Sequence, residues 1–390
     1  MSRAIEAVSI PFHRASLGEE EVEAVAEVIR SGWLTMGTKT LEFEREFAKY
    51  VGAQHAVAVC SGTAALHLAL EAIGLQPADE VLIPTTTFTA TGEVVKYLGA
   101  RPVLVDIDPI TLNIDTTAAE RKITQRTRAL MPVHMAGQPC DLDELHSFAG
   151  AHQLRVIEDA AHALPSEYRG RRIGSLSELT AFSFYATKTL TTGEGGMITT
   201  ESEERASRMR IMRLHGIAGD AWKRYGNSGS WYYEVVEAGY KYNPTDLQAA
   251  IGLVQLARCD ALNDARHRIA ARYTSAFKEV NALEPPTLKR DRRTSWHLYI
   301  LRLRLEQLKI DRNAFIQELK GRGIGTSVHF IPLHLHPYYQ RACGYRNGDF
   351  PVAEWEFQRC LSLPIYPAMS DGEVEQVIDN VTEIATRARR

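Results

Sequence analysis

A lysine lies on a short polar bend between two strand-like segments of this chain. Lys188 follows the apolar segment 179–185 and precedes a glycine-rich turn, 193–196, that leads into a second strand-like segment, 197–200. Packed backbone on both sides would hold a side-chain amine in such a bend and direct it into a cavity at the strand ends. A lysine on a loop is most often only solvated, so a chemical role needs a second feature.

An acidic residue at the end of another predicted strand supplies that feature. The apolar segment 155–159 ends in Asp159, and His162 follows after two alanines. Strand ends of open α/β sheets are where ligand-binding side chains gather. A lysine and an aspartate in these places match the pair used by pyridoxal phosphate enzymes. The lysine forms a Schiff base with the cofactor aldehyde, and the carboxylate keeps the pyridine nitrogen protonated so that the ring accepts electrons.

Such a cofactor also carries a phosphate, which requires a binding turn. Ser61, Gly62 and Thr63 form a turn between a predicted strand, 56–60, and a predicted helix, 64–73. Backbone N–H groups and hydroxyls at a helix N-terminus bind phosphate well. The chain therefore contains the three parts that a pyridoxal 5'-phosphate site needs.

The composition is that of a soluble globular protein. The 390 residues are 45% hydrophobic and 24% charged, with a net charge of −3. This length predicts a large core and two domains. The balanced charge does not indicate a nucleic-acid or membrane partner. The five cysteines are scattered without a Cys-x-x-Cys spacing, and there is no signal-peptide pattern or long apolar run, so we expect reduced thiols and a cytoplasmic location.

Strands and helices alternate between residues 54 and 200, which predicts an α/β fold. Predicted strands lie at 55–60, 80–83, 102–105, 128–132, 154–157, 179–184 and 196–200, and helices at 17–32, 64–73, 89–98, 142–152 and 201–215. We expect a mostly parallel mixed sheet covered by helices on both faces, a three-layer α/β/α arrangement. The fingerprints of common nucleotide folds, Gly-x-Gly-x-x-Gly after an early strand and Gly-Lys-Ser/Thr, are missing.

The rest of the chain predicts a smaller C-terminal α+β domain. We expect a mobile loop at 217–238, a long bridging helix at about 247–280, strands at 296–303 and 325–331, and helices at 312–323 and 371–387. The predicted division is a large cofactor-binding domain, 1–250, and a small domain, 251–390.

Five motifs in this order give the chain a family resemblance. They are Ser61–Leu66, Glu158–His162, Ser183–Lys188, Gly193–Gly196 and Gly239–Asp246. Together they resemble the DegT/StrS-type aminotransferases, which put amino groups on nucleotide-linked keto sugars. The resemblance covers nearly the whole chain and implies the type I fold of pyridoxal phosphate transferases.

The resemblance implies roles for further residues around the cofactor. Phe88 would stack on the pyridine ring, His162 would hydrogen-bond the phenolic oxygen, and Ser183 would bind phosphate beside Gly62 and Thr63. In relatives, the segment that here is 239–246 crosses to the neighbouring subunit and touches its phosphate. Asn243 is our first choice for that contact and Lys241 the alternative. Shared active sites of this kind imply a homodimer.

Substrate contacts are implied at two further places. The loop after the first helix lies near the sugar in the family, which gives Thr35 a role there. Segment 327–339 contains three histidines, and we expect it to form a polar lip that contacts the sugar chiefly through His329. No carboxylate or cysteine completes a metal-ligand spacing with these histidines, so we expect no metal.

The implied reaction has two halves. L-Glutamate leaves its amino group on the cofactor as pyridoxamine 5'-phosphate and departs as 2-oxoglutarate, and a nucleotide-diphosphate keto sugar then takes the amine. Lys188 would carry the proton between the α-carbon and the cofactor carbon. We favour amination at C4, with C3 as the alternative. Two other possibilities are a pyridoxal phosphate-dependent sugar dehydratase and a non-catalytic regulatory protein that binds the cofactor.

Overall fold

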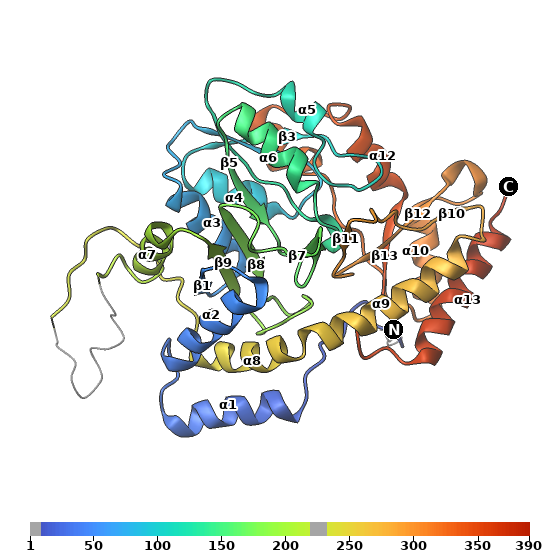
Figure 1. Cartoon of the computed structure of the whole chain (residues 1–390). Coiled ribbons are helices and arrows are strands. Elements are labelled where there is room, and N and C mark those ends of the chain that lie inside the picture. The colour runs from blue at the N-terminus through green and yellow to red at the C-terminus, as the bar shows by residue number, and fades with distance from the viewer. Residues whose placement is uncertain (1–8, 219–231) are drawn as a thin grey trace, which may run out of the picture.

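The structure is a computed structural model, which describes residues 9–218 and 232–390 (Figure 1). Within these residues the largest sheet has seven strands in the order β1-β9-β8-β5-β4-β2-β3. Their bounds are β1 (His55–Val59), β2 (Glu80–Pro84), β3 (Arg101–Val105), β4 (Thr127–Leu130), β5 (Arg155–Asp159), β8 (Leu179–Ser183) and β9 (Gly196–Thr200). Strand β9 runs antiparallel to both of its neighbours, and the other pairs are parallel.

Helices cover both faces of this sheet. Along β2, Val81 and Ile83 belong to the core on one face while Leu82 belongs to the core on the other, as the alternation of side chains along a strand requires. The first core is completed by α3 (Gly62–Ala72), α4 (Thr89–Tyr97) and α7 (Glu203–Met212); the second by α2 (Thr38–Val51), α5 (Thr116–Glu120), α6 (Leu142–Ala151) and α8 (Asp246–Ala257). The predicted three-layer α/β/α arrangement is confirmed.

The strand directions bring four chain segments to one edge of the sheet. Strands β1, β2, β5 and β8 are mutually parallel, so their carboxyl ends lie on the same side. Ser61 follows β1, Phe88 follows β2, Asp159 ends β5 and Lys188 follows β8. Residues that are far apart in the sequence are therefore placed around one opening.

A second, antiparallel sheet forms the core of the C-terminal part. It contains β10 (Leu283–Glu284), β12 (Tyr299–Leu303) and β13 (Cys360–Leu363), and it packs with α9 (Cys259–Phe277), α10 (Arg312–Gly321) and α13 (Asp371–Arg387). Ile10 also lies in this core and forms a bridge with Ile324. The predicted α+β character of the C-terminal part is confirmed.

Two predicted elements differ in the structure. The helix expected at 247–280 is divided at Arg258, because α8 packs on α1 (Glu19–Ser31) and α2 whereas α9 packs on α13. The prediction of a strand at 325–331 is wrong, since this segment makes an isolated bridge at Ser327, to Ser362, and forms no strand. The loop expected at 217–238 falls mostly outside the described residues.

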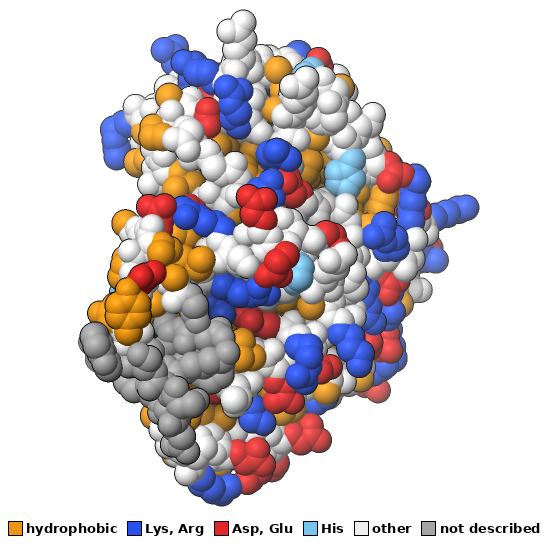
Figure 2. All heavy atoms as spheres, turned by 60° about the vertical axis from the view of Figure 1, so that its left-hand side comes forward, with side chains coloured by type: hydrophobic (Ala, Val, Ile, Leu, Met, Phe, Trp, Pro, Cys, Tyr) orange, Lys and Arg blue, Asp and Glu red, His pale blue; other side chains and the backbone are white. Residues whose placement is uncertain are grey.

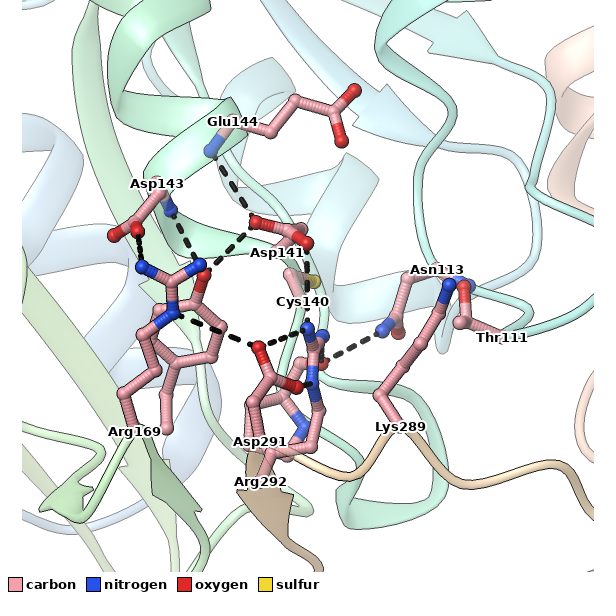
Figure 3. A network of polar contacts seen from close by, with 12 residues as sticks. Thr111, Asn113, Cys140, Asp141, Asp143, Glu144, Arg169, Lys289, Asp291 and Arg292 are labelled. Atoms are coloured by element: carbon pink, nitrogen blue, oxygen red, sulfur yellow. Dashed lines mark hydrogen bonds and ion pairs between the residues drawn. The ribbon is translucent and has the colours of Figure 1, made fainter.

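A small third sheet and a polar network join the two parts of the chain (Figure 3). Strand β11 (Arg292–Arg293) pairs with β6 (Glu167–Tyr168), which pairs with β7 (Arg171–Arg172). The Asp141 carboxylate accepts hydrogen bonds from the Tyr168 hydroxyl at 2.9 Å and from Arg292 at 3.3 Å. Arg169 bridges Asp143 and Asp291 beside them.

The charged surface is mixed, as the composition predicts. On the face drawn in Figure 2, basic and acidic side chains alternate without a large area of one sign. No helix in the described ranges 9–218 and 232–390 is long and apolar enough to cross a membrane.

Candidate active site

A cavity of about 480 Å³ opens at the edge of the large sheet where the four strands end. Its walls come from the segments after β1, β2, β5 and β8 and from the C-terminal part of the chain. The lining residues used below are Ser61, Gly62, Thr63, Phe88, Thr91, Asp159, His162, Ser183, Lys188, His297, His329 and Phe330. The structure thus brings together nine residues that the sequence singled out.

Lys188 is the buried amine of this cavity. Its backbone N–H donates to the Tyr185 carbonyl at 2.9 Å, and the neighbouring Ala186 carbonyl lies 3.0 Å from His13 Nε2, so the bend is fixed on both sides. Burial lowers the pKa of the Lys188 amine to about 8, although Asp159 opposes this shift. Because burial disfavours the ammonium form, far more of the amine is unprotonated near neutral pH than in an ordinary lysine, and this form can accept a proton.

Asp159, the last residue of β5, lines the same cavity. Its Oδ2 accepts from the Thr91 hydroxyl at 2.8 Å and its Oδ1 accepts from the Ala161 N–H at 3.1 Å. Burial raises the pKa of this carboxyl, while the hydrogen bonds from Thr91 and Ala161 and the charge of Lys188 oppose that effect. A buried carboxylate in this position is suited to a protonated nitrogen, because a partner of opposite charge offsets the cost of its burial.

The turn after β1 forms a close-fitting cradle. Ser61 is the N-cap of α3, and its hydroxyl accepts from the Ala64 N–H at 3.1 Å. A Cβ atom on Gly62 would lie only 2.7 Å from the Cβ of Ser183. Glycine therefore lets the helix N-terminus approach β8, and Gly62, Thr63 and Ser183 line the cavity together.

Rings form another wall of the cavity. The centroid of the His162 ring lies 4.3 Å from that of His297 and 5.8 Å from that of Phe330. The planes of the His162 and Phe330 rings are nearly parallel, at 23° to each other. Phe330 in turn lies 6.0 Å from Phe88, whose side chain is 58% exposed. Phe88 is thus available at the mouth of the cavity for a flat partner.

These residues fit pyridoxal 5'-phosphate. The cradle at Gly62 matches its phosphate, the Asp159 carboxylate matches its pyridine nitrogen, and Lys188 matches its aldehyde. The buried Nδ1 of His162 has no hydrogen-bond partner in the described structure, which is the kind of unfilled polar group found at ligand sites. When bound, this cofactor supplies an electron-accepting ring that stabilises negative charge on a substrate carbon.

Three predicted residues do not line this cavity. The Thr35 carbonyl accepts from the Asp246 N–H, and Lys241 Nζ donates to Asn243 Oδ1 at 2.5 Å. Because the sequence analysis placed Asn243 or Lys241 at the phosphate of a neighbouring subunit, a single chain does not test that contact. It stays a prediction, as does the contact of Thr35 with the sugar.

The three lip histidines separate in the structure. His329 lines the cavity, its Nδ1 lies 2.8 Å from the Ser362 hydroxyl, and burial lowers its pKa to about 4. His334 is buried elsewhere, between Thr85 at 2.8 Å and Glu354 at 3.0 Å. Over residues 9–218 and 232–390, no three metal-ligating side chains lie close enough to hold an ion.

Sequence reasoning did not single out Thr91, His297 and Phe330 for roles in the site. Thr91 lies in the threonine-rich segment 85–91 after β2, which is a signal for polar contacts at a strand end. His297 lies at the start of a predicted strand, and nothing local to it points to Lys188. Such long-range neighbours become visible only in the folded chain.

The fold and the site together define an aminotransferase that uses pyridoxal 5'-phosphate. The sequence matches the DegT/DnrJ/EryC1/StrS aminotransferase family over residues 15–382, and the chain belongs to this family. The predicted family, enzyme class and cofactor are confirmed.

Curated and solved relatives agree with this assignment. The chain is 50% identical over 380 residues to the spore coat polysaccharide biosynthesis protein SpsC of Bacillus subtilis, covering 97% of this chain and 98% of SpsC. Spr1654 of Streptococcus pneumoniae, a proposed sugar aminotransferase, superposes with a TM-score of 0.91 in its pyridoxamine phosphate form, at 36% identity over 97% of this chain and 100% of that chain. The pyridoxal phosphate form of Spr1654 superposes with a TM-score of 0.90, at 35% identity over 98% of this chain and 100% of that chain.

A third relative is an aminotransferase of pseudoaminic acid biosynthesis. PseC of Helicobacter pylori superposes with a TM-score of 0.90 at 28% identity, covering 97% of this chain and 99% of PseC. Sugar aminotransferases therefore recur among the similar structures, and the chain is assigned to that group of enzymes.

Proposed function

We propose that this enzyme moves an amino group from L-glutamate to C4 of a nucleotide-diphosphate keto sugar. The observation that carries the proposal is that Lys188 and Asp159 line one cavity of about 480 Å³. The pKa of about 8 for Lys188 suits an amine that both takes and returns a proton. The names of SpsC, Spr1654 and PseC support a sugar as the acceptor.

Each residue of the cavity has a task in this reaction. Lys188 would take the proton from the α-carbon of glutamate and pass it to the cofactor carbon. In the second half-reaction it would take a proton from that carbon and deliver one to the sugar carbon that gains the amine. Asp159 would keep the pyridine nitrogen protonated through both halves, with Thr91 and Ala161 keeping its carboxylate in place. The rings of His162, Phe330 and Phe88 line the cavity beside the reacting atoms.

The lip supports a sugar acceptor. His329 is neutral at physiological pH because burial lowers its pKa to about 4, so its free ring nitrogen offers a hydrogen bond without a charge. Neutral donors and acceptors suit the hydroxyls of a sugar ring. The choice of C4 comes from segment 331–337, which resembles the lip of enzymes that act on 4-keto-6-deoxy N-acetylhexosamines.

A substrate panel tests the proposal. Purified enzyme is incubated with glutamate and a series of 3-keto and 4-keto nucleotide sugars, and NMR locates the aminated carbon while 2-oxoglutarate is measured. We expect 2-oxoglutarate in equal amount to a 4-amino sugar. Amination at C3 would contradict the proposal and show that the enzyme acts at that carbon. Loss of water from the sugar without glutamate consumption would indicate a dehydratase. The Lys188→Ala variant is the control and should form neither product.

The proposal includes a homodimer in which Asn243 reaches the phosphate of the neighbouring site. Light scattering on the purified enzyme should give twice the mass of one chain, 43.6 kDa. Mixing an Asn243→Ala chain with a Lys188→Ala chain tests whether the sites are shared. If each cavity takes Lys188 from one chain and Asn243 from the other, a mixed dimer has one cavity with both changes, which is inactive, and one cavity with neither, which is active. No recovery of activity in the mixture would contradict shared sites.

A further inference from the structure

Helix α3 contacts the segment that the proposed function sends to the neighbouring subunit. His67 lies buried in the second turn of this helix, and its Nδ1 is hydrogen-bonded to the Tyr242 hydroxyl at 3.0 Å. The centroid of the His67 ring lies 4.8 Å from that of Tyr240 and 5.9 Å from that of Tyr242. The first turn of the same helix contains the cradle at Gly62. One helix therefore touches both the cradle of its own cavity and residues 240–243, which we call the arm.

The side chains of the arm divide between its two sides. Tyr240 and Tyr242 stack on each other, with centroids 5.0 Å apart and planes at 10°, and both pack on the core that includes α3. Lys241 is exposed, and its Nζ donates to Asn243 Oδ1 at 2.5 Å. Lys241 also forms an antiparallel bridge with Leu214, and side chains alternate along such an extended segment. The two tyrosines thus hold the arm, while Lys241 and Asn243 are left on its other side.

Backbone hydrogen bonds fix the path of the arm. The Tyr242 N–H donates to the Arg213 carbonyl at 2.8 Å, and the His215 N–H donates to the Tyr240 carbonyl at 2.7 Å. The Tyr242 carbonyl accepts at 2.7 Å from the N–H of Cys60, which directly precedes the cradle. These bonds hold the backbone of the arm, and the bond with His67 holds the side chain of Tyr242 against α3.

Packing alone does not explain an imidazole at position 67. Burial lowers the pKa of His67, so the ring is neutral. Its Nε2 is shielded from solvent and has no hydrogen-bond partner within residues 9–218 and 232–390. An apolar ring in the same place would leave no polar atom unsatisfied, and an unpaired buried polar atom costs free energy. What the imidazole adds is its hydrogen bond with Tyr242.

We propose that His67 is a positioning residue for the cofactor site of the neighbouring subunit. It holds Tyr242, and with it the side of the arm that carries Lys241 and Asn243, in the place from which that side reaches the neighbour's phosphate. This inference rests on the proposed function, in which Asn243 makes that contact. Its consequence is that a substitution in α3 weakens cofactor binding in the neighbour's cavity rather than in its own.

Two single substitutions remove the hydrogen bond from either end. His67→Phe keeps a ring in the core and removes Nδ1, whereas Tyr242→Phe keeps the stacked rings and removes only the hydroxyl. Tyr97→Phe is the matched control, because the Tyr97 ring also contacts His67, with centroids 5.6 Å apart, but its hydroxyl donates to Glu93. Circular dichroism checks that each variant is folded.

The first measurement is the affinity of each variant for pyridoxal 5'-phosphate, read from the absorbance of its Schiff base with Lys188. We expect His67→Phe and Tyr242→Phe each to weaken binding about fivefold, as the loss of one neutral hydrogen bond predicts. The double variant should bind no more weakly than either single variant, because both changes remove the same bond. Tyr97→Phe should equal the wild type. Wild-type affinity of both variants, or additive effects in the double variant, would overturn the inference.

The second measurement identifies the cavity that is affected. Mixed dimers are prepared from two differently tagged chains, one of which carries Lys188→Ala, so that only one cavity forms the Schiff base and gives the absorbance. In the first dimer His67→Phe is in the chain that keeps Lys188, and in the second it is in the chain with Lys188→Ala.

The expected results for these two dimers differ. The first should match a mixed dimer without His67→Phe, and the second should bind about fivefold more weakly, since its competent cavity receives the altered arm. Weakening in the first dimer, or in neither, would overturn the inference, because a merely structural role of His67 acts on its own cavity.

A further pair of mixed dimers separates this inference from the proposed function. In these dimers Lys241→Ala and Asn243→Ala together take the place of His67→Phe. If neither dimer binds the cofactor more weakly, the arm does not reach the neighbour's phosphate, and the shared site of the proposed function fails together with the inference. If these changes weaken the second dimer but His67→Phe does not, the shared site stands and the inference about His67 alone is overturned.

Discussion

The proposed function depends on the amine of Lys188, and the protonation of this amine gives a first prediction. Burial lowers its pKa from 10.5 to about 8, so the unprotonated fraction rises with pH through that value. Only the unprotonated amine attacks the aldehyde of pyridoxal phosphate. The rate at which cofactor-free enzyme develops visible absorbance should therefore rise with pH and level off above about 8.

The Asp159→Asn variant tests how the Asp159 carboxylate affects the pKa of Lys188. The negative charge of Asp159 raises the pKa of Lys188 and so works against burial. Removing that charge should move the midpoint of the pH profile below 8, while affinity for the cofactor falls about 100-fold because a charged hydrogen bond is lost. A midpoint near 10.5 in the wild type would show that the amine is not buried as described.

Among single residues, those that lie in a local motif could be predicted from the sequence to belong to the site. Lys188, Asp159 and the turn at Ser61 each lie in a recognisable strand-end segment, and all three line the cavity. His297 and Phe330 could not be predicted in the same way, since their neighbours are more than a hundred residues away in the sequence. Their roles depend on how the C-terminal sheet docks, which no local pattern records.

At the scale of elements, the contact between α3 and β8 determines the geometry of the turn that we propose holds the phosphate. A methyl group on Gly62 would lie 2.7 Å from the Ser183 Cβ, so Gly62→Ala must push the helix start away from the strand. We expect the variant to bind pyridoxal phosphate about tenfold more weakly, measured by absorbance titration. Gly150→Ala in α6 is the control, because a Cβ there meets nothing within 4 Å; equal affinity of both variants would contradict this role of Gly62.

The start of α8 holds the start of α2 through one buried carboxylate. Asp246 accepts from the N–H groups of Gly37, Lys39 and Thr40 at 2.8, 3.2 and 3.0 Å and from the Thr40 hydroxyl at 2.7 Å. Asp246→Ala should lower the free energy of unfolding in urea by about 3 kcal/mol, because these donors lose a charged acceptor.

The exposed Asp371 in the first turn of α13 provides a comparison for Asp246. Its side chain is fully exposed, and Asp371→Ala should change the free energy of unfolding by less than about 0.5 kcal/mol. If both alanine variants were equally stable, the capping role of Asp246 would be ruled out.

Helices and strands were predicted well where a single local pattern of residues determines the element. The seven strands of the large sheet were each predicted near their observed positions, because buried strands with turn residues between them are a local signal. The break at Arg258 was missed, since residues on both sides favour helix and only the packing of α8 and α9 on different partners divides them. Segment 325–331 has strand-forming residues, yet it leaves the sheet and places His329 and Phe330 at the cavity.

At the scale of the whole molecule, the two parts of the chain must stay docked for the cavity to exist, since His297, His329 and Phe330 come from the C-terminal part. The network in Figure 3 contributes to this docking. The side chain of Arg292 is 3% exposed and donates to Asp141, Asp291 and the Pro139 carbonyl. Arg292→Ala should destabilise the protein by about 2 kcal/mol, because Asp141, Asp291 and the Pro139 carbonyl would each lose a hydrogen bond from a buried guanidinium.

Arg169 in the same network is the matched control. Its side chain is 57% exposed, so Arg169→Ala should cost less than about 1 kcal/mol in the same urea experiment. The pKa of Asp291 is lowered by its hydrogen bond with Arg292, and that of Asp141 is lowered by Tyr168 and Arg292 against the effect of burial. This stability is present above their ordinary pKa near 3.8 and is lost as the pH falls below it, so wild type and Arg292→Ala should converge in acid.

The central claim is that the amine of Lys188 holds the cofactor, and reduction with borohydride tests it most directly. Borohydride fixes any bond between pyridoxal phosphate and a lysine, and mass spectrometry of the digested protein identifies the modified residue. We predict one phosphopyridoxyl group per chain, on the peptide that contains Lys188, and none in the Lys188→Ala variant. Modification of another lysine, or of none, in a wild-type enzyme saturated with the cofactor would contradict the claim.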